Sequence, residues 1–385
     1  MQSKNIIFQK FGQKLSNKNK IKKLLNFYSG KKLIKSFSNK YSYSFNKSKI
    51  YKYKKFNHYT ILGMGGSSLG SEAIYNFLSY KIKKKFSFKN NLSNNELKLD
   101  KKFKKNLNII ISKSGNTLET ITNFNTLKYK NNNLFICEQS NNYLRKLAYK
   151  LKSEIIEHRN YIGGRYSVLS ETGMLPAMLM GLDEKKFKNF DNLIKNKAFL
   201  DALIDSVSST IYFVNQKKLN SVILNYDESS EELFKWYQQI IAESLGKKTK
   251  GIMPIISPMP KDNHSMMQLY LDGPKNCFFT FFDVIDKNKK IKIKQHILES
   301  HKYLKNKNIN EVKTAQKNAT KIIFRRKNIP FRSFDLISRS ESSIGEMFTF
   351  FMLETILLGE LLKVNPFDQP SVELIKVETN KILKS

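Results

Sequence analysis

One stretch of the chain gathers side chains suited to binding a phosphate group. Residues 109–111 are three isoleucines, typical of a buried parallel strand, and the residues from Leu118 onward can open a helix. Free N–H groups at a helix N-terminus attract anions. A helix cap needs only one hydroxyl, whereas this segment offers several hydroxyls and a cation. The sequence therefore predicts a phosphate site formed by Ser112, Lys113, Ser114, Thr117 and Thr120.

A second turn of the same kind lies about fifty residues earlier. Residues 59–63 (YTILG) form a short apolar strand, which runs into the glycine-rich segment 64–70 and then a helix. Glycine lets the backbone turn sharply and approach a ligand closely, so Gly66 and Ser67 are candidates for ligand contact. Parallel α/β sheets bind ligands at the carboxyl ends of their strands, so we expect the two turns to meet there.

Residues suited to acid–base chemistry are dispersed along the chain. Gln239 and Glu243 lie four residues apart on one face of a helix over residues 231–245, and a carboxylate there is a candidate general base. Arg165 follows Gly163 and Gly164 and could stabilise an oxyanion. His264 lies in a polar loop and could transfer protons. Taken alone, Glu243 is better explained as an exposed glutamate of a helix, whereas the position of Arg165 between two glycines and a Tyr-Ser pair favours contact with a ligand.

The chain is strongly basic. Sixty-eight Lys and Arg residues against 32 Asp and Glu give a net charge of +36. The lysines are scattered and accompany many Asn and Ile residues, so we interpret the charge as compositional drift and expect neither a nucleic-acid nor a membrane partner.

No His, Cys or acidic cluster has metal-ligand spacing. Two cysteines, no secretory signal and no apolar run long enough to span a bilayer favour a cytoplasmic protein.

Alternating strands and helices predict two α/β units with parallel sheets. The expected strands cover residues 59–63, 109–111, 133–137, 219–224, 277–284 and 331–337. We expect a helical segment at 1–50 that packs on the second unit, a first domain at 51–182, a second at 183–364 and a tail at 365–385.

Six segments in this order resemble the phosphoglucose isomerase family: the glycine-rich turn at 65–70, SKSGNTLET, GGRYSVLS, Gln239 with ESLGK, DNHSMMQL and FDQPSVELIK. The resemblance extends over about residues 60–376. It implies two sugar-isomerase-type α/β/α sandwich domains with parallel sheets, a C-terminal helical tail, and a homodimer without metal or organic cofactor. The chain has Ser371 and Ile375 where the family usually has glycine.

The resemblance also implies roles in the interconversion of glucose 6-phosphate and fructose 6-phosphate. Glu243 would move a proton between C1 and C2 through a cis-enediolate, and Arg165 would stabilise the negative oxygen. His264 of the other subunit and Lys376 would open the sugar ring. The substrate-binding set would be Gly66, Ser67, Ser112, Lys113, Ser114, Thr117, Thr120, Gly164, Gln239 and Gln369.

Two alternatives remain open from the sequence. One is a dual phosphoglucose and phosphomannose isomerase, which would also turn over mannose 6-phosphate. The other is a non-catalytic sugar-phosphate sensor with a basic nucleic-acid-binding surface, in which Glu243 would be dispensable and binding salt-sensitive.

Overall fold

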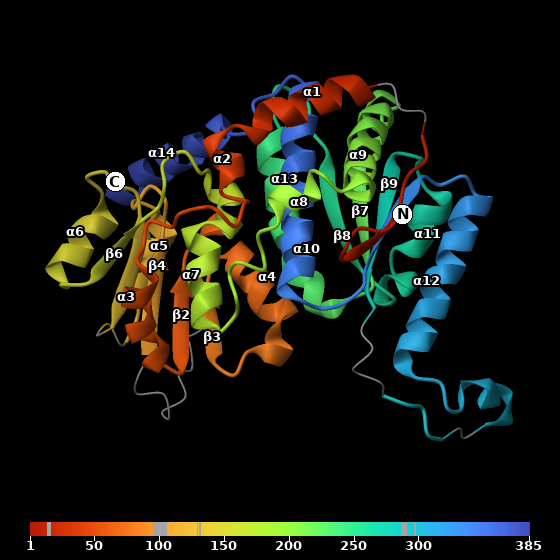
Figure 1. Cartoon of the computed structure of the whole chain (residues 1–385), viewed down its shortest axis with the longest axis horizontal. Coiled ribbons are helices and arrows are strands. Elements are labelled where there is room, and N and C mark those ends of the chain that lie inside the picture. The colour runs from red at the N-terminus through yellow and green to blue at the C-terminus, as the bar shows by residue number, and fades with distance from the viewer. Residues whose placement is uncertain (14–16, 95–105, 129, 131, 286–290, 296–297) are drawn as a thin grey trace.

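The computed structural model (Figure 1) describes residues 1–13, 17–94, 106–128, 130, 132–285, 291–295 and 298–385. Two five-stranded sheets lie next to each other, with helices packed around them. None of the helices in these ranges is long and apolar enough to cross a membrane.

The first sheet is parallel throughout, with strand order β3-β2-β4-β5-β6. Its strands are β2 (His58–Leu62), β3 (Lys85–Lys89), β4 (Asn106–Ile111), β5 (Asn133–Cys137) and β6 (Glu154–Glu157). The helices of this half are α4 (Leu69–Phe77), α5 (Leu118–Asn125), α6 (Tyr143–Lys150) and α7 (Glu171–Leu179), with the 3-10 helices η2 (Gly65–Ser67), η3 (Ser79–Lys81) and η4 (Gly164–Leu169). Every residue of the central strands β2, β4 and β5 is buried, as expected for strands covered on both faces.

The second sheet has the order β1-β10-β9-β7-β8, parallel except for β1. Its strands are β1 (Ile6–Gln9), β7 (Asn220–Asn225), β8 (Met253–Pro258), β9 (Cys277–Val284) and β10 (Phe331–Leu336). Its helices are α8 (Phe190–Leu193), α9 (Lys197–Asn215), α10 (Glu231–Leu245), α11 (Met267–Asp272), α12 (Ile309–Arg326) and α13 (Glu341–Leu361), with η5 (Glu228–Ser230), η6 (Lys261–His264) and η7 (Glu299–Leu304). The N-terminal part adds α1 (Lys18–Ser29), α2 (Lys32–Lys35), α3 (Lys47–Tyr51) and η1 (Lys52–Lys55), and the chain ends in α14 (Pro370–Lys384).

The predicted α/β class with parallel sheets and a helical C-terminal end is confirmed. All six predicted strands exist, and each occupies an interior position of its sheet. The strands that the sequence missed, β1, β3, β6 and β8, are the four edges. Edge strands carry lysines, prolines and short apolar runs, so their sequences lack the continuous apolar signal of a covered strand. The proposed domain boundaries stay predictions.

The helical reading of residues 1–50 is wrong for Ile6–Gln9, which form β1. Ile6 and Phe8 face the core, whereas Ile7 on the opposite face is 36% exposed. This alternation is the period of a half-buried strand. The strand pairs antiparallel with β10, so the first residues of the chain complete the second sheet.

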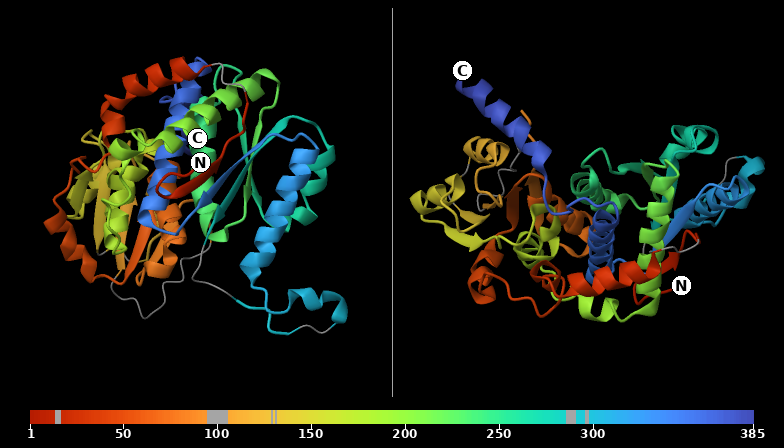
Figure 2. Two further views of the ribbon diagram at one scale, coloured as in Figure 1. Left: turned by 45° about the vertical axis from the view of Figure 1, so that its right-hand side comes forward. Right: turned by 90° about the horizontal axis from the view of Figure 1, so that it is seen from above.

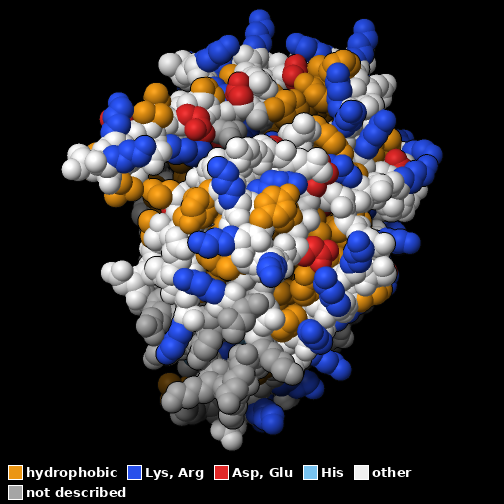
Figure 3. Space-filling model, turned by 90° about the vertical axis from the view of Figure 1, so that its left-hand side faces the viewer, with side chains coloured by type: hydrophobic (Ala, Val, Ile, Leu, Met, Phe, Trp, Pro, Cys, Tyr) orange, Lys and Arg blue, Asp and Glu red, His pale blue; other side chains and the backbone are white. Residues whose placement is uncertain are grey.

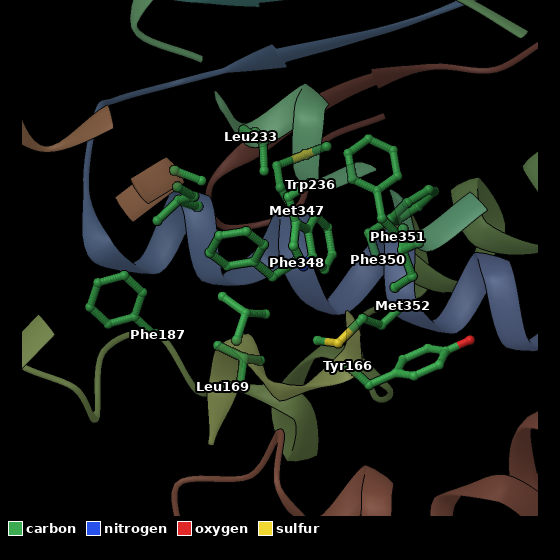
Figure 4. Packing of buried hydrophobic residues seen from close by; sticks show 14 of the residues in the cluster. Tyr166, Leu169, Phe187, Leu233, Trp236, Met347, Phe348, Phe350, Phe351 and Met352 are labelled. Carbon is green, nitrogen blue, oxygen red and sulfur yellow. The ribbon is translucent and has the colours of Figure 1, made fainter. Parts of the chain in front are cut away.

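A single apolar core joins the two halves of the molecule. Trp236 of α10 packs edge-to-face on Phe348 of α13, with ring centroids 4.8 Å apart. Leu169 and Tyr166 of η4 reach the same cluster from the first half (Figure 4). The loop that carries Arg165 is therefore held at a defined distance from α10.

Helix α14 projects from the body of the molecule (Figure 2, right). None of its residues is buried, although it carries Leu374, Ile375, Ile382 and Leu383, each at least 66% exposed.

The face in Figure 3 shows Lys and Arg side chains spread over it without a single dense patch.

We predict that Phe8→Ala lowers the free energy of unfolding by about 3–5 kcal/mol, the usual cost of truncating a buried phenylalanine. Phe8 lies 5.5 Å from Phe334 and 5.7 Å from Phe350 between ring centroids, so the truncation leaves a cavity between β1 and α13. Ile7→Ala is the matched control on the other face of β1, with an expected loss of at most about 1 kcal/mol. Equal losses in urea unfolding would contradict the placement of β1.

Candidate active site

The two predicted turns follow adjacent parallel strands. Helix η2 begins three residues after β2, and the turn at 112–117 directly follows β4. Gly63 holds the two together: a Cβ atom there would lie 2.9 Å from both the Ile111 carbonyl oxygen and the Ser67 Cβ. Only glycine fits this approach, so Ser67 lies beside the end of β4.

The turn after β4 is built from hydrogen bonds among its own side chains. Ser112 Oγ and Thr117 Oγ1 are 2.8 Å apart, and Ser112 Oγ accepts from the Gly115 N–H at 3.2 Å. Thr117 is the N-cap of α5 but its side chain makes no capping bond, so the first N–H groups of α5 remain available to an anion. Gly115 has φ +66°, and a Cβ there would overlap the Asn142 side chain.

Two other predicted phosphate ligands, Lys113 and Ser114, lie within this turn, and Thr120 lies in the first turn of α5. Lys113 Nζ donates to the Asn160 carbonyl at 2.9 Å and lies 3.5 Å from Glu138 Oε1. Ser114 is exposed, and its Oγ accepts from the Asn116 N–H. Thr120 Oγ1 is buried without a hydrogen-bond partner among the described residues. An unpaired buried hydroxyl is costly, which fits a group that awaits a ligand.

Gly66 joins the glycine-rich turn to the arginine loop. A Cβ on Gly66 would lie 2.3 Å from the backbone of Gly164 and 2.6 Å from the Arg165 nitrogen, and both are fixed backbone atoms. The Ser167 hydroxyl donates to the Gly66 carbonyl at 3.4 Å. Any side chain at position 66 would push the two loops apart, so this glycine sets the position of Arg165.

Arg165 is buried, and the structure surrounds its guanidinium with acceptors from two segments, the end of α10 and residues 366–369. Nε donates to Ser244 Oγ at 2.7 Å, and Nη2 donates to the carbonyls of Pro366 at 2.7 Å and Asp368 at 3.0 Å. Nη1 donates to Glu243 Oε1 at 3.1 Å and Gln369 Oε1 at 2.7 Å. An arginine has five N–H donors, so these acceptors use its full capacity.

Glu243 lies between a cation and an amide. Its Oε1 pairs with Arg165, and its Oε2 accepts from Gln239 Nε2 at 2.9 Å. Gln239 Oε1 is buried without a partner among the described residues, so it is free to accept a ligand hydroxyl. The Glu243 side chain keeps 22% of its surface exposed, which leaves it accessible from the site.

Sequence reasoning missed the groups that support Arg165. Ser244 binds both Arg165 and the Tyr166 hydroxyl, which lies 3.0 Å from Ser244 Oγ and donates to the Pro366 carbonyl at 3.1 Å. Burial raises the pKa of Tyr166 to about 12, so its phenol stays protonated as a donor. Ser244 lies within the ESLGK segment, but no sequence pattern indicates that it contacts Arg165, which lies 79 positions earlier in the chain.

His264 and Lys376 are not brought to this cluster in the single chain. His264 lies exposed in η6, and no hydrogen bond or ion pair between described residues links it to Arg165 or Glu243. Lys376 lies on α14, is 56% exposed, and pairs with Glu373 at 2.6 Å. Ser371, Ile375 and Lys376 all lie within α14, which runs without interruption from Pro370 to Lys384.

The sequence analysis also did not predict a buried histidine near the turn at 112–117. His158 follows β6, and its burial lowers its pKa to about 4, so the ring is neutral near pH 7. Its Nε2 has no partner among the described residues. In the part of the chain that the structure describes, no group of three or more His, Cys, Asp and Glu residues could hold a metal ion.

Comparison with known proteins gives a consistent answer. The family profile described as phosphoglucose isomerase matches residues 25–385. The probable glucose-6-phosphate isomerase of Methanococcus maripaludis is 32% identical over 243 residues, which cover 60% of this chain and 53% of that protein. The glucose-6-phosphate isomerase of Mycoplasmopsis pulmonis is 33% identical over 230 residues, 58% of this chain and 54% of that protein. The matched part of this chain spans about half the length of these relatives.

Solved structures share the fold. A hypothetical protein from Thermus thermophilus has a TM-score of 0.81 at 22% identity, covering 96% of this chain and 95% of that one. A glucose-6-phosphate isomerase from Chlamydia trachomatis has a TM-score of 0.67 at 19% identity, covering 88% and 72%. The resemblance inferred from the six sequence segments is confirmed by the profile match, and the chain belongs to the phosphoglucose isomerase family.

Proposed function

We propose that this chain interconverts glucose 6-phosphate and fructose 6-phosphate. The observation that carries the proposal is the Arg165–Glu243 pair, 3.1 Å apart, which adjoins the glycine turn after β2. The names of the relatives, glucose-6-phosphate isomerases, support the same reaction. A role in glycolysis and gluconeogenesis and a cytoplasmic location follow from this activity as predictions.

The phosphate would occupy the turn after β4. Ser112, Ser114 and Thr117 supply hydroxyls, Lys113 supplies charge, and the uncapped start of α5 supplies backbone N–H groups. The phosphate is remote from the reacting carbons, so its binding energy can position them for proton transfer.

Glu243 would act as the base on the open-chain sugar. Its carboxylate takes the proton from C2, the C2–H electrons form the C1=C2 bond, and O1 becomes negative in the cis-enediolate. The O2 proton moves to O1, and Glu243 returns its proton to C1 to give the ketose. Gln239 and Gln369 would hold sugar hydroxyls, and His264 of a second subunit with Lys376 would open the ring.

All five N–H donors of Arg165 already have acceptors, so Arg165 can stabilise an oxyanion only by giving up one of them. Nε and Nη2 bind Ser244 and two backbone carbonyls, whereas Nη1 binds only the side chains of Glu243 and Gln369. Side chains can rotate away more easily than backbone. We therefore infer that Nη1 exchanges one of these acceptors for the substrate oxygen.

We expect Glu243→Gln to lower kcat by about 10²–10⁴-fold, because the amide keeps the size of the side chain but cannot accept the proton. Affinity for a competitive sugar-phosphate inhibitor should stay close to that of the wild type. A coupled assay from fructose 6-phosphate, with mannose 6-phosphate as a comparison substrate, measures the effect. Glu231→Gln, exposed on the same helix, is the control; near-normal turnover of the Glu243 variant would remove this residue as the base.

Lys113→Ala should raise KM about tenfold or more while changing kcat little, because a charge-assisted contact to the remote phosphate contributes about 1.5–3 kcal/mol. Lys128→Ala removes the same charge from an exposed position and should change neither constant. A variant that loses kcat but keeps KM would contradict the phosphate assignment.

We propose that the active form is a homodimer in which His264 enters the partner's site. The exposed apolar residues of α14 support this assembly, since an isolated helix of fifteen residues is marginal in water without a packing partner. An isologous pair also gives each site one His264 from the other chain.

Complementation tests the shared site. Glu243→Gln and His264→Gln should each be inactive alone. When the two chains are co-refolded, random pairing should restore about a quarter of the sites, since half the dimers are mixed and each mixed dimer has one intact site. Absence of recovery, with mixed dimers demonstrated by differential tags, would place His264 in the site of its own chain, and full activity of His264→Gln alone would place it outside any site.

A further inference from the structure

Lys247 lies two residues beyond α10, and neither the phosphate site nor the proton transfer gives it a role. Its side chain is 10% exposed. Nζ donates to the Ser244 carbonyl at 2.9 Å and to the Asn365 carbonyl, and it pairs with Asp368 Oδ1 at 2.9 Å. One ammonium thus connects the end of α10 to both ends of the turn at 365–368, using its three donors.

The same turn anchors Arg165 from the other side. The carbonyls of Pro366 and Asp368 accept from Arg165 Nη2, and Gln369, the next residue, accepts from Nη1. Ser244, whose carbonyl binds Lys247, also accepts from Arg165 Nε through its hydroxyl. The arginine and the lysine therefore hold one short turn between them.

Two tyrosines hold the middle of this turn: the Tyr166 hydroxyl donates to the Pro366 carbonyl at 3.1 Å, and the Phe367 ring lies 5.7 Å from Tyr166 and 6.1 Å from Tyr28 between centroids. Asn365 Nδ2 donates to Asp368 Oδ2 at 3.0 Å, a bond within the turn itself. Pro366 packs on Gly359, and Phe367 is 38% exposed. Beyond the turn, α14 has no buried residue. Lys247 is the side chain that ties both ends of the turn, Asn365 and Asp368, to the end of α10.

We propose that Lys247 is a positioning residue for the isomerase reaction: by clamping the turn at 365–368 it fixes the guanidinium of Arg165 and the amide of Gln369. This rests on the proposed function. Loss of the clamp lets the turn move, and Arg165 loses the carbonyls that orient it. A displacement of about 1 Å at reacting groups can cost about 10²-fold in rate.

Lys247→Met removes the charge at similar length, and we expect kcat to fall by about 10–100-fold with a smaller change in KM, since the phosphate turn is untouched. Lys247→Arg can still pair with Asp368 and should recover most of the activity. Lys235→Met is the control: Lys235 lies on α10 and forms ion pairs with Glu231 and Glu232, remote from the tail. It should keep wild-type kcat.

Asp368→Asn tests the clamp from its exposed side, where misfolding is less of a concern. If the pair acts as a unit, the double variant Lys247→Met/Asp368→Asn should lose no more kcat than Lys247→Met alone. Multiplicative losses, or wild-type kcat in Lys247→Met, would overturn the proposal.

Hydrogen exchange separates this proposal from the proposed function. Peptides covering residues 363–372 should exchange faster in Lys247→Met than in Lys235→Met, with peptides of β4 unchanged. An inactive wild type would refute the isomerase assignment, whereas unchanged exchange at 363–372 would refute the clamp whatever the activity.

Discussion

A buried guanidinium is the constraint on which the site depends. Arg165 cannot leave water unless every N–H finds an acceptor, because an unpaired buried charge costs several kcal/mol. The chain supplies those acceptors from the end of α10 and from the turn before α14. Three segments that are remote in sequence must therefore meet at one point, and the meeting point is also where Glu243 lies.

The apolar core makes this meeting possible. Residues of η4, α10 and α13 pack in one cluster, so the loop with Arg165 and the helix with Glu243 move as one body. Close backbone approach at Gly66 then joins this body to the turns at the carboxyl ends of β2 and β4. The turn after β4, Arg165 and Glu243 thus share one frame, which the proposed reaction would require, because a substrate held by its phosphate must present its reacting carbons at a fixed position.

The single chain leaves part of the chemistry incomplete. Hydrogen bonds link Arg165, Glu243, Gln239 and Gln369, whereas His264 and Lys376 lie on exposed surfaces. Helix α14 presents apolar residues to solvent, which is unusual for a helix that ends a well-packed fold.

The sequence by itself determined the interior strands of both sheets. Segments rich in apolar residues predicted β2, β4, β5, β7, β9 and β10, because a strand covered on both faces buries most of its residues; β10 (FRSFDL) does so although it carries Arg332 and Asp335. The small and hydroxylated residues after β4 also predict an anion site. The conformation of such a short turn depends on its own residues and needs no distant partner.

Only the tertiary structure decided the sheet edges and the support of the site. Edge strands take their conformation from pairing with a neighbour, so β1 with its sequence IIFQ forms a strand only because β10 is beside it. The contacts of Arg165 with Ser244 and Pro366 join residues about 80 and 200 positions apart. No local propensity encodes such pairs, because their free energy arises only when the folded core brings the charge and its acceptors together.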